Sequence, residues 1–336
     1  KVQVILSCTK RHKKVSARVI KIYGKATSAK ICADAIIDAN GIPSVFPSDV
    51  IDEAKKAASL KITDHDLKDR LDLRNELIFT IDGADAKDLD DAISISLTEK
   101  GFKLGVHIAD VSHYVKANTK LDEEAQVRGT SVYFADRVIP MLPKEISNGI
   151  CSLNANEDKL TFSAIMDVDN NGNLLSYEFK KSIINSKVRG VYSEINDILN
   201  NTASNDILNK YKVVMDSIFN AKKLSDILEK KAANRGNMDI SSRESYFKLD
   251  ENGVCIDVSP RTQGASEKII EQFMILANES AAIYAKSSLI PFVYRVHEEP
   301  DPEKLQNLSN LVGLLGFNNR KIKVGAHAKD FQNLLE

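Results

Sequence analysis

The sequence predicts an α+β fold in which helices pack on a mixed sheet, preceded by the end of a small β-barrel. Runs that alternate apolar and polar residues, typical of strands, are interspersed with longer segments that carry apolar residues at helical spacing. The 336 residues are 43% hydrophobic and 28% charged, which is the composition of a soluble globular protein with room for about two domains.

Residues 1–25 predict a basic β-hairpin. Strand-like runs at residues 2–6 and 15–23 flank a turn, and no acidic residue precedes Asp34. Basic side chains gather in the turn at Lys10, Arg11, Lys13 and Lys14. The hairpin is interpreted as the end of a β-barrel whose loop faces phosphates, with a solvated basic hairpin as the alternative.

Residues 26–75 are expected to form a connector. Pro43 and Pro47 punctuate it, and Ser48 is predicted to cap a helix that runs to residue 60. A charged segment follows from residue 64 to residue 75. This connector leads into a region in which strand and helix patterns alternate.

That region predicts strands first and helices later. Alternation of apolar and polar residues indicates strands at residues 77–81, 93–97 and 102–111. A turn is expected between the second and the third of these strands. Apolar spacing and capping residues predict helices from Thr119 to Gly129, across 205–233, across 266–285 and between Asp301 and Gly316. A further helix is expected to begin near residue 329.

Four aspartates between the first two of these strands are the most informative feature of the chain. They are Asp82, Asp88, Asp90 and Asp91, and Gly83 permits a tight bend after the first. Two carboxylates about 4 Å apart repel by roughly 4 kcal/mol at an effective dielectric constant of about 20. A pocket that gathers all of them therefore requires a cation, and oxygen ligands on a short loop suit Mg²⁺ or Mn²⁺.

The four aspartates allow three other interpretations. A solvated acidic loop is disfavoured because the loop contains Asp and no Glu. An EF-hand is excluded because Ala84 and Ala86 stand where oxygen ligands are required, and no Glu closes the loop. A phosphotransferase with Asp88 as nucleophile and Asp90 as acid stays open, although it gives the other two aspartates no role.

Taken with its neighbours, this stretch resembles the ribonuclease II / ribonuclease R (RNB) family of 3′→5′ exoribonucleases, and within it the ribonuclease R branch. The resemblance covers most of residues 75–315. Its motifs are TIDGADAKDLDDA from residue 80, HIADVSHYV from 107, LDEEAQVRGTSVYF from 121, VIPMLPKEISNGICSLN from 138, KIIEQFMILANESAA from 268 and YRVHEEPDPEKL from 294.

The resemblance implies a metal-dependent hydrolase that degrades RNA processively from its 3′ end and releases nucleoside 5′-monophosphates. On the matching positions the four aspartates would be catalytic and would hold Mg²⁺, with Mn²⁺ as the alternative. Asp82 and Asp91 would ligate the metal, and Asp88 and Asp90 would complete its cage. Phosphodiester hydrolysis fits this site, since a pair of metal ions can activate water and stabilise the leaving oxygen.

The resemblance also implies two residues that contact the terminal nucleotide. Tyr133 would stack on the 3′-terminal base, and Glu271 lies in the block that contacts that nucleotide. The alternative for Tyr133 is a core position, because it stands in an apolar run. Base stacking on an aromatic ring contributes about 1–3 kcal/mol for any base, which suits an enzyme that accepts every sequence.

By the same resemblance, residues 1–25 would be the tail of a cold-shock (OB-type) RNA-binding domain, 26–75 a connector, and 76–336 the N-terminal part of the RNB catalytic domain. The family's TSPIRRY-type stretch, with its phosphate-contacting arginine, and its C-terminal S1 barrel do not occur in the sequence. We therefore expect a fragment that is truncated at its C-terminus and poorly active by itself.

Two other functions compete with the exoribonuclease. One is a non-catalytic module that binds single-stranded RNA through Tyr133 and the basic N-terminal region. The other is a small-molecule phosphatase. Histidine-based hydrolysis is disfavoured, because the six histidines form no H-E-x-x-H site. His107 and His113 are expected to be core or surface residues rather than metal ligands.

Composition sets the remaining expectations. The four cysteines show no CxxC spacing, which favours a reducing cytoplasm. Neither an apolar run of membrane length nor a signal-peptide pattern occurs, so no membrane partner is expected. The expected partner is the 3′ end of single-stranded RNA. A monomer is expected, although the sequence leaves the oligomeric state open.

Overall fold

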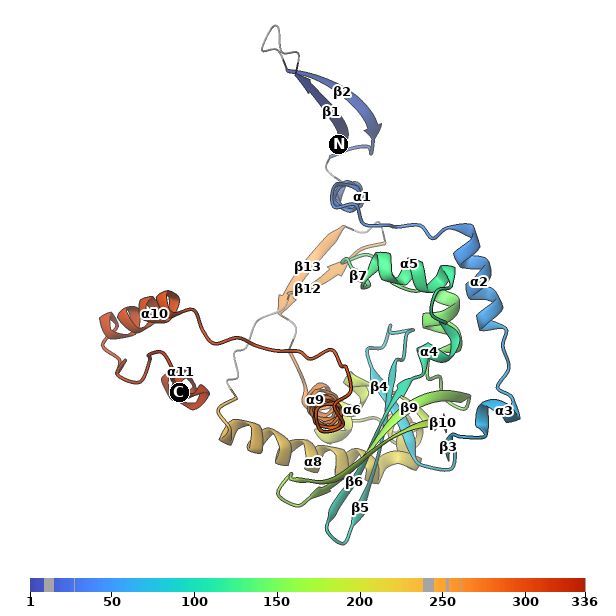
Figure 1. The fold of residues 1–336 in the computed structure, drawn as a ribbon, viewed down its shortest axis with the longest axis vertical. Helices are drawn as coiled ribbons and strands as arrows, with labels where there is room; N and C mark the ends of the chain where they lie inside the picture. Colours follow the sequence, from blue (N-terminus) through green and yellow to red (C-terminus); the bar gives the residue numbers. More distant parts are fainter. Residues whose placement is uncertain (9–14, 27, 238–244, 252–253, 261, 336) are drawn as a thin grey trace. The chain divides into compact units, whose positions relative to one another are not determined.

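The computed structural model describes residues 1–8, 15–26, 28–237, 245–251, 254–260 and 262–335 (Figure 1). The chain divides into two internally packed units. The first comprises Lys1–Ile62, Val111–Ser152 and Arg243–Thr262. The second comprises Thr63–Asp110, Leu153–Ser242 and Gln263–Glu336, and it contains all four aspartates.

A seven-stranded mixed sheet forms the centre of the second unit, in the order β11-β4-β5-β6-β9-β10-β3. Its central neighbours pair antiparallel, whereas β3 lies parallel to β10 and β11 lies parallel to β4. The strands are β3 (Leu71–Leu73), β4 (Ile78–Asp82), β5 (Asp91–Thr98), β6 (Gly101–Ala109), β9 (Asp158–Asp169), β10 (Leu174–Asn185) and β11 (Val188–Val191). The predicted mixed sheet is confirmed.

Three helices of this unit, α6 (Tyr192–Leu199), α8 (Met215–Asn234) and α9 (Ala265–Ser287), cover one face of the sheet (Figure 1). Strand alternation explains which side chains meet them, because successive residues point to opposite faces. Phe102, Leu104 and Val106 of β6 are buried in one core with residues of the helices such as Phe273. The remaining elements of the unit are α3 (Asp64–Leu67), α7 (Asn205–Tyr211), η2 (Lys212–Val214), α10 (Pro302–Leu314) and α11 (Ala328–Leu335).

Polar side chains occupy the opposite face of the same strands. His107 of β6 is fully buried, and its two ring nitrogens lie 3.0 Å from the Ser94 hydroxyl and 2.7 Å from the Ser163 hydroxyl. The Ser182 hydroxyl continues this network into β10. His107 is therefore a core residue, one of the two placements expected for it.

The first unit is mainly helical between its hairpins. Helix α2 packs against α5 and against the π-helical turn η1, and the Leu121 amide at the start of α5 donates to Glu53 of α2 at 2.6 Å. The elements are β1 (Val2–Cys8), β2 (Val15–Ile22), α1 (Ala29–Ala39), α2 (Ser48–Ala58), α4 (Val111–Tyr114), α5 (Lys120–Arg128), β7 (Val132–Tyr133), β8 (Val138–Ile139), η1 (Glu145–Ile150), β12 (Ser245–Leu249) and β13 (Cys255–Pro260).

Several predicted helix ends are confirmed, whereas the predicted cap of α2 and the predicted continuity of the helix across 205–233 are wrong. Thr119 caps α5, and Gly129 ends it in the left-handed conformation with φ 69°. Helix α2 begins at Ser48, but no side chain caps it and Pro47 holds the cap position. The long helix expected across 205–233 is divided by the 3₁₀ turn η2, which separates α7 from α8. No helix among the described residues combines the length and the apolar character that crossing a membrane requires.

Candidate active site

The four aspartates lie where β4 ends and β5 begins. Asp82 is the last residue of β4 and Asp91 the first of β5, while Asp88 and Asp90 belong to the loop between them. The Gly83 amide donates to the Asp82 carboxylate at 2.7 Å, so the backbone turns directly around this side chain. The sheet thus holds the two outer aspartates, as the alternation of the sequence predicted.

The end of β6 and the segment that precedes β9 hold the second half of the loop through its backbone. The Ala109 amide, at the end of β6, donates to the Asp90 carbonyl at 2.9 Å. The Leu153 amide donates to the Leu89 carbonyl at 2.8 Å, and the Leu89 side chain is buried. These contacts fix the backbone on which Asp90 and Asp91 stand.

An arginine from the parallel neighbour β11 holds the first half of the loop. The Arg189 Nη2 atom donates to the carbonyls of Ala84 at 3.0 Å and Ala86 at 2.7 Å. Burial raises the pKa of Asp82 above its ordinary value and the Asp88 carboxylate adds to the rise, whereas the Gly83 amide and the Arg189 charge oppose it. Arg189 is not predicted from the sequence, because only the pairing of β11 with β4 brings it to the loop.

Burial and mutual repulsion disfavour the charged form of these carboxylates. Burial, followed by the Asp82 and Asp90 carboxylates, raises the pKa of Asp91 to about 6. Burial, followed by the Asp88 and Asp82 carboxylates, raises the pKa of Asp90 to about 6 as well. Asp90 is exposed as a whole residue and Asp91 is half-buried. Water therefore stabilises the charged form of Asp90 more than that of Asp91. The aspartates therefore lie near enough for one carboxylate to disfavour the charged form of another.

One oxygen of this group has no protein partner. Asp91 Oδ2 is buried without a hydrogen bond, a condition shared among the described residues only by Thr80 Oγ1. A buried charged oxygen without a partner is unfavourable, and coordination to a cation would remove the penalty. The donor chemistry of the four carboxylates thus fits a hard divalent cation. No three His, Cys, Asp or Glu side chains in the described part of the chain already stand in a metal-ligating cluster.

The other residues expected to contact RNA are distributed over both units. Tyr133 lies in β7 of the first unit with its residue surface 68% exposed, so the alternative of a core position for it is wrong. Glu271 is exposed on α9, in the same unit as the aspartates. The basic residues predicted to face phosphates lie outside the described residues: Lys10, Arg11, Lys13 and Lys14.

Comparison with protein families gives a match to the RNB domain across residues 70–336. Ribonuclease R of Thermotoga maritima is 44% identical over 328 residues, which cover 96% of this chain and 46% of the relative.

Two solved structures with a similar fold are complexes of Mycoplasma genitalium RNase R. The complex with ribose-methylated single-stranded RNA has a TM-score of 0.89 at 31% identity, covering 96% of this chain and 50% of that one. The complex with double-stranded RNA has a TM-score of 0.92 at 29% identity, covering 99% and 59%. This chain spans about half the length of the relatives that it matches.

Proposed function

Because this chain belongs to the RNB domain family, we propose that its aspartate group is the hydrolytic site of a 3′→5′ exoribonuclease. The observation that carries the proposal is the state of Asp91, whose Oδ2 atom is buried and unpartnered and whose pKa is raised. A fold keeps such a carboxylate where a bound cation offsets its cost. The similarity to ribonuclease R makes RNA the substrate class that fits best.

Asp82, Asp88, Asp90 and Asp91 would hold Mg²⁺, with Mn²⁺ as the alternative. The bound ions would supply an activated water and neutralise charge on the leaving oxygen. The protein's own contribution would be to fix the backbone that carries the carboxylates, through the contacts of Ala109 and Leu153 and of the Arg189 guanidinium. Such preorganisation acts without rearrangement during the reaction.

The substrate under this proposal is the 3′ end of single-stranded RNA. Tyr133 would stack on the terminal base, and its exposed ring supports that role. Glu271 would contact the terminal nucleotide. The M. genitalium RNase R structures hold single-stranded and double-stranded RNA, which supports RNA as the partner of this chain too.

The layout of the chain completes the proposal. Residues 1–25 would be the tail of a cold-shock domain, with the basic turn on the phosphates, and 26–75 would connect it to the catalytic residues 76–336. We propose a cytoplasmic monomer.

A single-turnover assay tests this function. The chain is in excess over 5′-labelled single-stranded RNA, and Mg²⁺ or Mn²⁺ is present. We expect stepwise shortening from the 3′ end, with release of nucleoside 5′-monophosphates. Asp90→Asn should abolish shortening while RNA binding persists. Asp85→Asn is the matched control, because Asp85 is an exposed aspartate of the same loop.

Two outcomes would contradict the proposal. Internal cleavage products would exclude a 3′→5′ exonuclease. Normal shortening by Asp90→Asn would exclude the aspartate group as the hydrolytic site. RNA binding that is indifferent to EDTA, with no shortening under any metal, would favour the non-catalytic module, and turnover of a generic phosphomonoester would favour the phosphatase.

A further inference from the structure

The hairpin that carries Tyr133 is too short to be stable by itself. Strands β7 and β8 are each two residues long, with Val132 paired to Ile139 and Tyr133 paired to Val138. Isolated two-stranded hairpins are at best marginally stable in water, even when they are longer. Contacts from outside the hairpin therefore add to the stability of the strand that carries Tyr133.

Arg128, the last residue of α5, provides the strongest of these contacts. Its side chain is only 2% exposed, and its Nε atom donates to the Glu124 carboxylate at 2.9 Å. Its Nη1 atom donates to the Pro140 carbonyl, directly after β8, at 3.2 Å. A buried guanidinium is thus hydrogen-bonded to the hairpin where its second strand ends.

The same guanidinium also forms hydrogen bonds with residues 43–46, the segment before α2. Its Nη1 and Nη2 atoms donate to the carbonyls of Pro43 at 2.7 Å and Val45 at 3.0 Å. The Phe46 ring lies beneath it, 3.6 Å from the guanidinium carbon to the ring centroid. Arg128 therefore joins α5, residues 43–46 and the end of the hairpin through one planar group.

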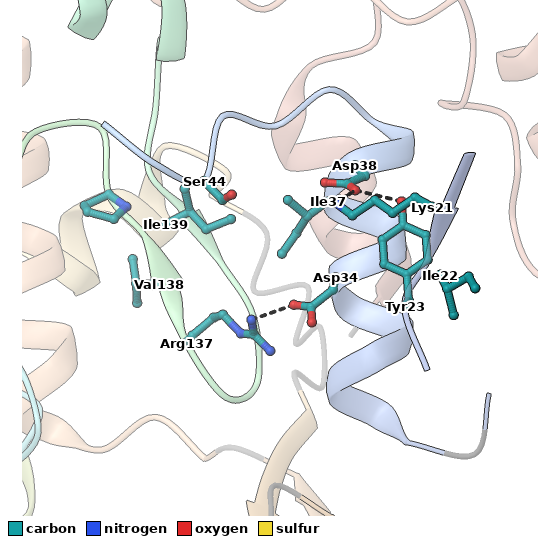
Figure 2. Close-up of a pocket in the computed structure, with 11 residues that line it drawn as sticks. Lys21, Ile22, Tyr23, Asp34, Ile37, Asp38, Ser44, Arg137, Val138 and Ile139 are labelled. Atoms are coloured by element: carbon teal, nitrogen blue, oxygen red, sulfur yellow. Dashed lines mark hydrogen bonds and ion pairs between the residues drawn. The ribbon is translucent and has the colours of Figure 1, made fainter. Parts of the chain in front are cut away.

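A second arginine contacts the hairpin from its turn, but more weakly. Arg137 donates to Asp34 of α1 at 2.7 Å, on the edge of a pocket of about 420 Å³ lined by both side chains (Figure 2). Both side chains are roughly one-third exposed, at 29% and 36%. Exposed ion pairs contribute little, so Arg128 is the more firmly held of the two arginines that contact the hairpin.

We infer that Arg128 is a positioning residue for RNA binding, since it fixes the hairpin so that Tyr133 meets the terminal base with little loss of freedom. The inference rests on the proposed stacking role of Tyr133. Lysine cannot replace the guanidinium, because it lacks the planar donor fork and the stacking surface. Ordering the hairpin in advance lowers the entropy lost on binding.

A double-mutant cycle on the full chain tests this inference, with the binding of 5′-labelled oligoadenylate measured by fluorescence anisotropy in EDTA. Tyr133→Ala should weaken binding by about 5-fold to 100-fold. Arg128→Lys should weaken binding about 5-fold in the wild-type background and less than about 2-fold in the Tyr133→Ala background. A purely structural role would not produce this dependence on Tyr133.

The outcomes separate the inference from the proposed function. Equal loss from Arg128→Lys in both backgrounds, or no loss in a folded variant, would overturn the inference alone. Unchanged binding by Tyr133→Ala would overturn the stacking role and the inference together. If Arg128→Lys unfolds, Phe46→Leu is read in the same cycle, because it removes the ring beneath the guanidinium and keeps an apolar side chain.

Discussion

The Arg70 guanidinium donates to the Asp110 carboxylate at 2.6 Å, and both side chains are about 95% buried, with 5% and 4% exposed. Two further donations from Arg70 satisfy the carbonyls of Thr161 and Ser182 on β9 and β10. Asp110 directly follows the Ala109 amide that holds Asp90. The pair therefore fixes the end of β6 beside the aspartate loop.

Arg70→Met is expected to lower the free energy of unfolding by about 3–5 kcal/mol, because it removes the cation that is paired with a buried carboxylate. Urea denaturation measures this change. Arg74→Met is the matched control, since Arg74 pairs with Asp72 on the surface and should contribute about 1 kcal/mol or less. Similar losses in the two variants would contradict a special role for the buried pair.

Gly190 of β11 approaches β4 so closely that a Cβ atom would lie 2.3 Å from the Thr80 carbonyl oxygen. Gly190→Ala should therefore separate β11 from β4 and lower stability by about 1–3 kcal/mol. It should also weaken metal binding, because the neighbouring Arg189 holds the aspartate loop. Gly149→Ala, where the nearest atom is 3.7 Å away, is the control for unfolding in urea. Equal stability of both variants would refute the close contact.

His107 predicts how stability changes with pH. Burial lowers the pKa of His107 from 6.5 to about 3, so the folded chain keeps it neutral. Its contribution is fully present above pH 6.5 and is lost as the pH falls toward 3, because only the unfolded chain takes up the proton. Between pH 8 and pH 5 this loss amounts to about 2 kcal/mol. His107→Gln should remove that part of the pH dependence of urea unfolding, and an unaltered profile would contradict it.

In the metal-free protein, Asp91 is expected to change stability with pH in the direction opposite to that of His107. Its pKa is raised to about 6, so its charged form destabilises the fold above that pH and the penalty disappears below about pH 4. In EDTA at pH 8, Asp91→Asn should raise the free energy of unfolding by about 1–2 kcal/mol. Asp85→Asn, at an exposed position, should change it little. A loss of stability in Asp91→Asn would count against a strained ligand site.

Local signals explain what the sequence could predict. The cap at Thr119, the stop at Gly129 and the Asp301-Pro302 start of α10 depend on neighbours within one turn, and each is where the pattern put it. The placement of Asp82 at the end of β4 and of Asp91 at the start of β5 is local for the same reason, since one short loop joins two alternating strands.

Contacts between distant segments explain what the sequence could not predict. The parallel pairing of β11 with β4, which brings Arg189 to the aspartate loop, joins residues more than one hundred positions apart. The burial of Arg128 likewise depends on carbonyls from both the connector and the hairpin. No periodicity within either segment records these contacts, so charge and spacing alone assign both arginines to the surface.

Isothermal titration calorimetry with Mg²⁺ and Mn²⁺ tests the central claim, that the aspartate group binds a divalent cation. Asp82→Asn and Asp91→Asn should each weaken binding by about 10-fold or more, because each removes a charged ligand. Asp85→Asn should weaken it less than about 3-fold. Unchanged affinity in both ligand variants would contradict the account.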